Sequence, residues 1–289
     1  ERYIMSKRKV CVVINNRANY ARIKSALSAM KKNKKIELQI VLGSSAILNR
    51  YGSVSNIIKS DGFKINHIVY TLVEGENLLT MAKSTGLSIV EYSTVFNYLK
   101  PDIVLVIADR YETLAAATAA SYMNILLAHT QGGEVTGSID ESVRHATTKL
   151  SHIHFPSSIN AKKNIINLGE DSKKVFLVGC PSLDLINKDK IKLDKKFKKK
   201  YSNYGVGELK IDFDKPYIVI LQHPVTTEYK QIKKDIQETI KASLEVKMQV
   251  VWLWPNVDAG SDIVSKSIRI LREEKKPKNI RWQKNYNPE

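Results

Sequence analysis

The stretch ADRYETLAAATAASYMNILLAHTQGGEVTGSIDESVRHATTKLSHIHF, residues 108–155, decides the fold of this chain. It begins at the end of the run DIVLVIA at 102–108, whose continuous apolar character is typical of a parallel strand buried on both faces. Helix-length and strand-length segments then alternate along it. We expect a helix at 113–123, a strand at 124–129, a helix at 142–150 and a strand at 152–155.

The same alternation extends to both sides of this stretch. We predict strands at 9–14, 37–42, 67–72 and 175–178, and helices at 18–30, 77–99 and 161–168. Pro101 ends the long helix, because proline disfavours helical geometry in the residue before it. Strands that alternate with helices indicate a doubly wound α/β domain, which we assign to residues 5–185.

A lysine-rich stretch interrupts this rhythm at residues 186–214, and we interpret it as an interdomain connection with one short helix. Alternation then resumes, with predicted strands at 217–221, 249–254 and 280–283 and helices at 230–244 and 263–273. These elements are about half of a second α/β domain, over residues 215–289. The predicted fold class is α/β, with two Rossmann-like doubly wound domains of which the second is incomplete in this chain.

The composition limits the class of protein. Of the 289 residues 43% are hydrophobic, yet no apolar run approaches the roughly 20 residues of a membrane-spanning helix. The chain does not open with the basic and then apolar segments of a signal peptide. The two cysteines, Cys11 and Cys180, lie in apolar, strand-like surroundings, which indicates reduced thiols. We therefore expect a cytoplasmic protein with no membrane partner.

The formal charge of +17 raises nucleic acid as a possible partner. Eight of the lysines, however, lie between Lys188 and Lys200, and aromatic residues are not interleaved with the charges as base-stacking platforms require. No zinc-finger spacing is present either. We interpret the charge as a solvated lysine-rich face and expect no nucleic-acid partner.

Polar residues follow several predicted strands, at the edge where parallel α/β sheets bind their ligands. In chain order they are Arg17, Ser44, Asp109, the run from His129 to Glu134, Asp140, Arg144, His145, His223 and the run from Pro255 to Ser261. Each has a plainer explanation, since an aspartate at a strand end often caps a helix and an arginine on a helix is usually surface charge. Acids, bases and a cation at one rim nevertheless favour a site.

Several common motifs are absent from the sequence. It contains no G-x-S-x-G elbow, no G-x-G-x-x-G fingerprint and no Walker loop. His152 and His154 alternate along one predicted strand, but no cluster of cysteines or carboxylates joins them, so we predict no metal site. The residues alone indicate a two-domain α/β enzyme that acts on a phosphorylated ligand with carboxylates.

Six segments carry a more specific signal. They are NNRANY at 15–20, VLGSS at 41–45, the stretch 108–155, VGCPSLD at 178–184, LQHPVTTE at 221–228 and PNVDAGS at 255–261. Together they resemble the hydrolysing UDP-N-acetylglucosamine 2-epimerases, which supply N-acetylmannosamine for sialic acid synthesis. The resemblance runs from about Val10 to Asn287. It implies the two-Rossmann-domain arrangement of the B-type glycosyltransferases, with the site in the cleft between the domains.

The resemblance also implies the chemistry. UDP leaves by anti elimination with loss of the C2 proton, and water adds to the resulting 2-acetamidoglucal to give the 2-epimer. Such a reaction calls for positive charge at the diphosphate, a base near C2 and an acid–base group that handles water. It requires no metal and no other cofactor.

By the same resemblance, Asp109, Glu134, Asp140 and His223 are the expected catalytic residues, with Asp109 and Asp140 as acid–base carboxylates. The expected substrate-binding residues are Arg17, Ser44, Gln131, Arg144, His145, Asn256, Asp258 and Ser261. A UDP-sugar is the expected partner, and the alanine-rich helix at 113–123 and the helix at 142–150 suit a homodimer or homotetramer.

The chain departs from the family pattern at several places. Asn19 replaces an acidic residue that is common there, and Ser45 stands where some relatives have histidine. Gln131 stands where relatives often carry glutamate, and an amide cannot be a general base. Either Glu134 takes that role, or Glu134 caps the following turn and Gln131 only orients the substrate. The sequence also lacks the glycine- and serine-rich turn that holds UDP in the family, together with the glutamate that holds its ribose.

Three alternatives stay open at this point. The same chemistry can act on UDP-2,4-diacetamido-2,4,6-trideoxyhexose, as in legionaminic acid synthesis. A non-hydrolysing epimerase would add UDP back instead of water. A catalytically inactive sugar-nucleotide-binding protein would use the same fold without turnover.

Overall fold

A computed structural model describes residues 7–186 and 194–283 of the chain. The described residues form two compact units, one of residues 7–73 and 82–186 and one of residues 74–81 and 194–283. The segment 74–81 belongs to the second unit, where the Gly260 N–H donates to the Glu76 carbonyl at 2.7 Å.

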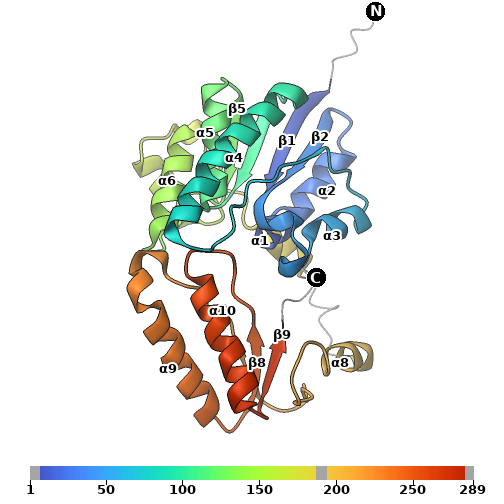
Figure 1. The fold of residues 1–289 in the computed structure, drawn as a ribbon. Helices are drawn as coiled ribbons and strands as arrows, with labels where there is room; N and C mark the ends of the chain where they lie inside the picture. Colours follow the sequence, from blue (N-terminus) through green and yellow to red (C-terminus); the bar gives the residue numbers. More distant parts are fainter. Residues whose placement is uncertain (1–6, 187–193, 284–289) are drawn as a thin grey trace, which may run out of the picture. The chain divides into compact units, whose positions relative to one another are not determined.

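The first unit is a parallel sheet wrapped by helices (Figure 1). Its strands are β1 (Arg8–Ile14), β2 (Ile36–Leu42), β3 (His67–Ile68), β4 (Ile103–Ile107), β5 (Leu126–Thr130) and β6 (Ile153–Phe155). Its helices are α1 (Arg17–Ala21), α2 (Lys24–Lys32), α3 (Val54–Ser60), α5 (Tyr111–Tyr122), α6 (Ile139–Leu150), α7 (Ile159–Asn167) and most of α4 (Leu78–Leu99). The strand order β3-β2-β1-β4-β5-β6 is that of a doubly wound Rossmann-like domain, as the alternation of strands and helices predicts.

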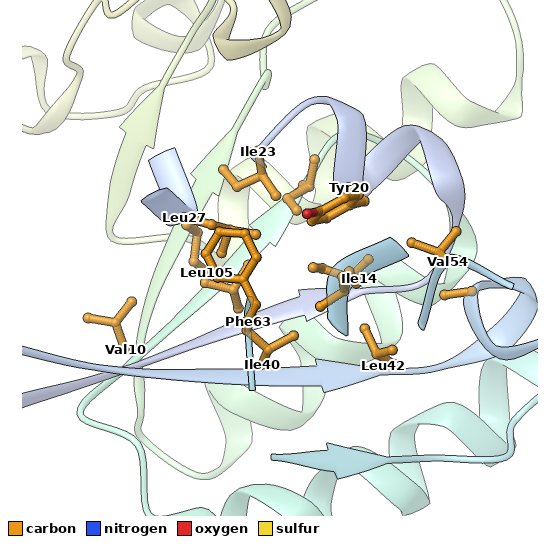
Figure 2. Packing of buried hydrophobic residues seen from close by; sticks show 14 of the residues in the cluster. Val10, Ile14, Tyr20, Ile23, Leu27, Ile40, Leu42, Val54, Phe63 and Leu105 are labelled. Atoms are coloured by element: carbon orange, nitrogen blue, oxygen red, sulfur yellow. The ribbon is translucent and has the colours of Figure 1, made fainter. Parts of the chain in front are cut away.

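Two cores cover the two faces of this sheet, because successive side chains of a strand point to opposite faces. On one face Val10 and Ile14 of β1 pack with Ile40 of β2 against Ile23 and Leu27, as Figure 2 shows. The other face packs against α4 and the alanine-rich α5. That second core contains Cys11, Val13, Val106, Tyr92, Phe96 and five alanines of α5.

Apart from shifts of one to three residues in the bounds of other elements, the observed elements differ from the predicted ones at four places. The single helix expected at 18–30 is broken at Arg22 and Ile23 into α1 and α2, and Ile23 is buried in the core at the break. The strand expected at 67–72 pairs over only two residues. The strand expected at 175–178 is reduced to one bridge between Val175 and His154. Helix α3 was not expected, since its seven residues are too few to show a clear period.

The second unit is a smaller parallel sheet, β7 (Tyr217–Ile220), β8 (Gln249–Leu253) and β9 (Ile280–Gln283), in the order β7-β8-β9. Its helices are α8 (Lys195–Tyr201), α9 (Ile232–Glu245) and α10 (Ser261–Ile270), and a π-helical turn (Leu271–Lys275) extends α10. Trp252 and Trp282 pack with the apolar residues of α9 and α10 into its core. The short helix expected in the lysine-rich stretch is α8.

Arg281 fixes a loop against the second sheet. Its side chain points away from the tryptophan core, since its neighbours Ile280 and Trp282 belong to that core. The guanidinium donates to five backbone carbonyls, those of Asn203, Tyr204, Gly205, Gly207 and Leu209. The residue is only 4% exposed. A single buried cation therefore holds the segment 203–209 in place.

Candidate active site

The carboxyl ends of β1, β4 and β5 bring the predicted site residues of the first unit to one edge, called the switch edge below. Strands β1 and β4 are adjacent, and the chain winds away from them in opposite directions, which is where open α/β sheets bind ligands. Arg17 is the first residue of α1, after β1, and is half-buried. Asp109 follows β4, and Gln131 follows β5.

The central feature of the switch edge is an ion pair between Asp109 and Arg144. The Nη2 atom of Arg144 donates to Oδ2 of Asp109. The Arg144 side chain is 2% exposed and that of Asp109 is 19% exposed. A buried cation is therefore paired with a carboxylate that solvent can reach. The plainer interpretation of Arg144 as surface charge is wrong. Its guanidinium holds the Asp109 carboxylate, and its predicted role in substrate binding stays a prediction.

Arg144 also holds the loop that carries Glu134. Its Nη1 atom donates to the Glu134 carbonyl at 2.5 Å, and the Thr136 hydroxyl lies 3.5 Å from both terminal nitrogens. The guanidinium of α6 thus ties the turn after β4 to the loop after β5. Because both loops share one buried cation, a shift of either is coupled to the other.

The turn after Glu134 is capped by Glu141 and not by Glu134. The Glu141 carboxylate accepts from the backbone N–H groups of Gly137 and Thr136, both at 2.6 Å. These two hydrogen bonds lower the pKa of Glu141 below its ordinary value. The exposed Glu134 side chain lines a hollow of about 560 Å³ with Ser158, Asn160 and Asn164. The capping interpretation of Glu134 is therefore wrong.

Asp140 and His145 both lie on α6. Asp140 is in its first turn, where a carboxylate interacts favourably with the helix dipole, and is half-buried. His145 lies one turn after Glu141, with its Nε2 atom 3.8 Å from a Glu141 oxygen. The first-turn position is favourable for Asp140 without any catalytic role, so that role stays a prediction.

Gln131 has an unusual backbone for its side chain. Its φ is +60°, in the left-handed region that few residues other than glycine adopt, and it is 4% exposed. Its Nε2 atom donates weakly to the sulfur of Cys180 at 3.7 Å. Left-handed non-glycine residues concentrate at functional sites, which favours a role for this amide in orientation.

A buried carboxylate that the sequence analysis did not single out lies beside the site. Glu112 is fully buried and accepts from the Ser44 hydroxyl at 2.7 Å and from Nε of Arg110 at 3.2 Å. Ser44 is itself 1% exposed. Its hydroxyl therefore makes a buried contact with Glu112 and is not open to solvent. The i to i+2 spacing of Arg110 and Glu112 directly after Asp109 is the only signal in the sequence.

The second unit brings its own predicted residues together at the carboxyl ends of β7 and β8. Exposed His223 accepts from the Asn256 backbone N–H through Nδ1 at 3.2 Å, which leaves the proton of the neutral ring on Nε2. The Asn256 side chain donates to Asp258 and accepts from the buried Ser261 hydroxyl at 3.0 Å. These contacts hold the loop before α10 in place. The roles of Asn256, Asp258 and Ser261 in substrate binding stay predictions.

In the described ranges 7–186 and 194–283, no group of three or more histidine, cysteine, aspartate or glutamate side chains is arranged to hold a metal ion. None of the helices in these ranges has the length and the apolar character of a membrane span.

The described site thus contains the solvent-accessible Asp109 carboxylate paired with the buried Arg144, the exposed Glu134 carboxylate and the buried Gln131 amide.

A family model described as UDP-N-acetylglucosamine 2-epimerase matches residues 28–287. The UDP-N,N'-diacetylbacillosamine 2-epimerase (hydrolyzing) of Legionella pneumophila is 35% identical over 262 residues, which are 91% of this chain and 67% of that protein. The GDP/UDP-N,N'-diacetylbacillosamine 2-epimerase (hydrolyzing) of Campylobacter jejuni is 34% identical, over 82% of this chain and 60% of that protein.

A more distant relative is the UDP-N-acetylglucosamine 2-epimerase of Neisseria meningitidis, 26% identical over 93% of this chain and 68% of that protein. The chain thus spans 60 to 68% of the length of these three relatives. Among solved structures, a UDP-GlcNAc 2-epimerase from Neisseria meningitidis bound to UDP-GlcNAc has a TM-score of 0.76 at 19% identity, covering 96% of this chain and 73% of that one. This likeness shows a shared fold.

Proposed function

The chain belongs to the UDP-N-acetylglucosamine 2-epimerase family, and we propose that it carries the proton-transfer site of a hydrolysing nucleotide-sugar 2-epimerase. One observation carries this proposal. Asp109 is a reachable carboxylate held by the buried Arg144 at the switch point of the first sheet. A carboxylate fixed in this way can remove or deliver a proton at a defined position.

Asp109 is the proposed group for the C2 proton. As UDP departs, the bond from C1 to the leaving oxygen breaks and electrons from the C2–H bond form the double bond of the glycal. The carboxylate takes the proton and Arg144 keeps the carboxylate in position. Water then adds at C1 and a proton returns to the opposite face of C2, which inverts that centre.

The second proton transfer needs a second acid–base group. Glu134 is the proposed residue, because its exposed side chain lines the polar hollow while its carbonyl is held by the same Arg144 as Asp109. Asp140 is the alternative carboxylate. The role of His223 toward the reacting sugar rests on the resemblance of its segment to the family.

The relatives favour a diacetamido sugar as the substrate over UDP-N-acetylglucosamine. The two relatives at 35% and 34% identity bear the name of a diacetylbacillosamine 2-epimerase, and the one at 26% that of a UDP-N-acetylglucosamine 2-epimerase. We therefore place UDP-2,4-diacetamido-2,4,6-trideoxyhexose first and UDP-N-acetylglucosamine second.

Separate assays with the two UDP-sugars test both parts of this proposal. The protein, at the full length that its gene encodes, is incubated with each UDP-sugar in the presence of EDTA, and UDP and the free sugar are quantified. We expect release of UDP with the 2-epimer and a higher kcat/KM for the diacetamido sugar. A preference for UDP-N-acetylglucosamine would reverse the order of substrates, and no turnover of either sugar would contradict the proposal.

A further inference from the structure

The backbone just before Asp109 adopts a conformation that its side chain disfavours. Ala108 has φ of +60°, in the left-handed region that costs any residue with a Cβ atom. Such a conformation persists only when surrounding groups hold it. The residue next in the chain is Asp109, so the direction of that carboxylate depends on what holds Ala108.

The ring of His129 holds Ala108 from the adjacent strand. Its Nε2 atom lies 2.7 Å from the Ala108 carbonyl, and the Ala108 N–H donates to the Thr130 carbonyl at 3.1 Å. A carbonyl can only accept, so Nε2 carries the proton. The other ring atom, Nδ1, lies 3.2 Å from the hydroxyl of Thr148 on α6. The hydroxyl therefore donates to Nδ1 when the ring is neutral.

The space around this contact has no room for another side chain. A Cβ atom on Gly132 would lie 2.8 Å from the Thr148 hydroxyl and 2.9 Å from His129 Nδ1. Both distances are shorter than normal van der Waals contacts. Glycine at this position therefore leaves room for the two hydrogen bonds that link Thr148 to His129 and His129 to Ala108.

We propose that His129 is a positioning residue, which holds the left-handed turn at Ala108 and so directs Asp109 toward Arg144 and the substrate. Thr148 fixes the ring. His129 is 1% exposed and is hydrogen-bonded to Ala108 and Thr148, so we infer that it acts through Asp109. This inference rests on the proposed function insofar as Asp109 is the proton-transfer group.

The charge state of the ring agrees with this role. Burial lowers the pKa of His129 to about 4, so the ring is neutral at neutral pH. A neutral ring has one donor and one acceptor, and the Ala108 carbonyl and the Thr148 hydroxyl use both.

Two substitutions of His129 test the proposal. His129→Leu fills similar space without a donor, whereas His129→Gln can place an amide N–H near the position of Nε2. We expect His129→Leu to lower kcat by about 10²-fold with KM within roughly threefold of wild type, since misplacement of a catalytic group lowers turnover. We expect His129→Gln to restore kcat to within about tenfold. Equal loss in both variants would overturn the proposal.

Two adjacent threonines of α6 give a matched control. Thr147 and Thr148 are both fully buried, and valine has nearly the shape of threonine without the hydroxyl. Thr148→Val should lower kcat, and Thr147→Val should not. Equal kcat values in these variants would contradict the role of Thr148. This pair also decides the matter if His129→Leu does not fold.

Crystal structures of the His129 variants separate this inference from the proposed function. We expect Ala108 to leave the left-handed region and the Asp109–Arg144 pair to break in His129→Leu, but not in His129→Gln. An unchanged Ala108 and ion pair in His129→Leu would overturn the positioning role even in an active enzyme. Absence of activity in the wild type would instead count against the proposed function alone.

Discussion

At the scale of single residues, substitution of Asp109 is the most direct test of the proposed site. Asp109→Asn keeps an oxygen that can accept from Arg144 but cannot take a proton. We expect kcat to fall by about 10²–10⁴-fold, as for a removed acid–base group. Steady-state kinetics with the preferred UDP-sugar measure this.

Asp102 provides the matched control for this change. It lies at the amino end of the same strand, where it accepts from the Lys9 N–H at 2.7 Å. Asp102→Asn should leave kcat unchanged. Full activity in Asp109→Asn would remove Asp109 from the mechanism.

Glu134 and Glu141 separate catalysis from stability. Because Glu141 caps the turn, Glu134→Gln should lower kcat by at least about 10²-fold with an unchanged Tm. Glu141→Gln should lower Tm, and Gln131→Ala should mainly raise KM. Kinetics and thermal unfolding of the three variants measure these effects. A Glu134→Gln enzyme with wild-type kcat would leave Asp140 as the second carboxylate.

His129 predicts a pH dependence of stability. Its pKa is about 4 in the folded state and 6.5 ordinarily, so the unfolded chain binds the proton more readily. The neutral ring thus contributes stability that is fully present above pH 6.5 and is lost as the pH falls to about 4. The loss is about 3 kcal/mol from this group. Denaturant unfolding of wild type and His129→Gln across this range measures the difference, which should shrink toward pH 4. A constant difference would contradict it.

At the scale of elements, Arg281 decides whether the segment 203–209 stays on the second sheet. Arg281→Met removes all five donors to its carbonyls, and we expect the free energy of unfolding to fall by about 2 kcal/mol. Hydrogen exchange should show lost protection at the Val206 amide, which pairs with Trp282. Lys241→Met, an exposed helix cation, should change neither quantity. Unchanged exchange at Val206 in Arg281→Met would show that the edge pairing holds the segment by itself.

The element scale also shows what the sequence pattern can and cannot predict. Strands β4 and β9 were expected within a residue or two because their apolar runs are continuous and clearly bounded. The break between α1 and α2 was not, since the apolar spacing of Ile23 and Leu27 continues across it. Which ends of neighbouring strands meet follows from the parallel order, so the switch edge could be predicted.

Side-chain partners at that edge could not be predicted in the same way. Arg144 is buried only because α6 packs it against the loops after β4 and β5, a contact across 35 residues to Asp109. Glu112 and His129 depend on similar tertiary contacts, and a single sequence carries no period that marks them. The predicted roles of these residues rest on the family resemblance, whereas their side-chain partners are seen only in the structure.

At the scale of the whole molecule, the lysine-rich segment has a structural explanation. Phe197 of α8 packs against Tyr201 and Phe213, with ring centroids 4.6 and 5.4 Å apart. The aromatic rings of this segment contact one another while the neighbouring lysines Lys195, Lys196, Lys199 and Lys200 are exposed, which agrees with the interpretation of a solvated lysine-rich face. The formal net charge of the whole chain is +17, and the expectation that nucleic acid is no partner stays a prediction.

On the proposed function, the chain carries the site where the C2 proton of a nucleotide sugar is exchanged. Turnover of UDP-2,4-diacetamido-2,4,6-trideoxyhexose in D₂O, followed by NMR of the free sugar, measures this exchange. We expect a 2-epimerised product with one deuterium at C2, because the removed proton mixes with solvent before a proton returns. A released sugar that keeps its original configuration and its C2 proton would indicate simple hydrolysis, which leaves the C2–H bond intact, and would rule out proton exchange at this site.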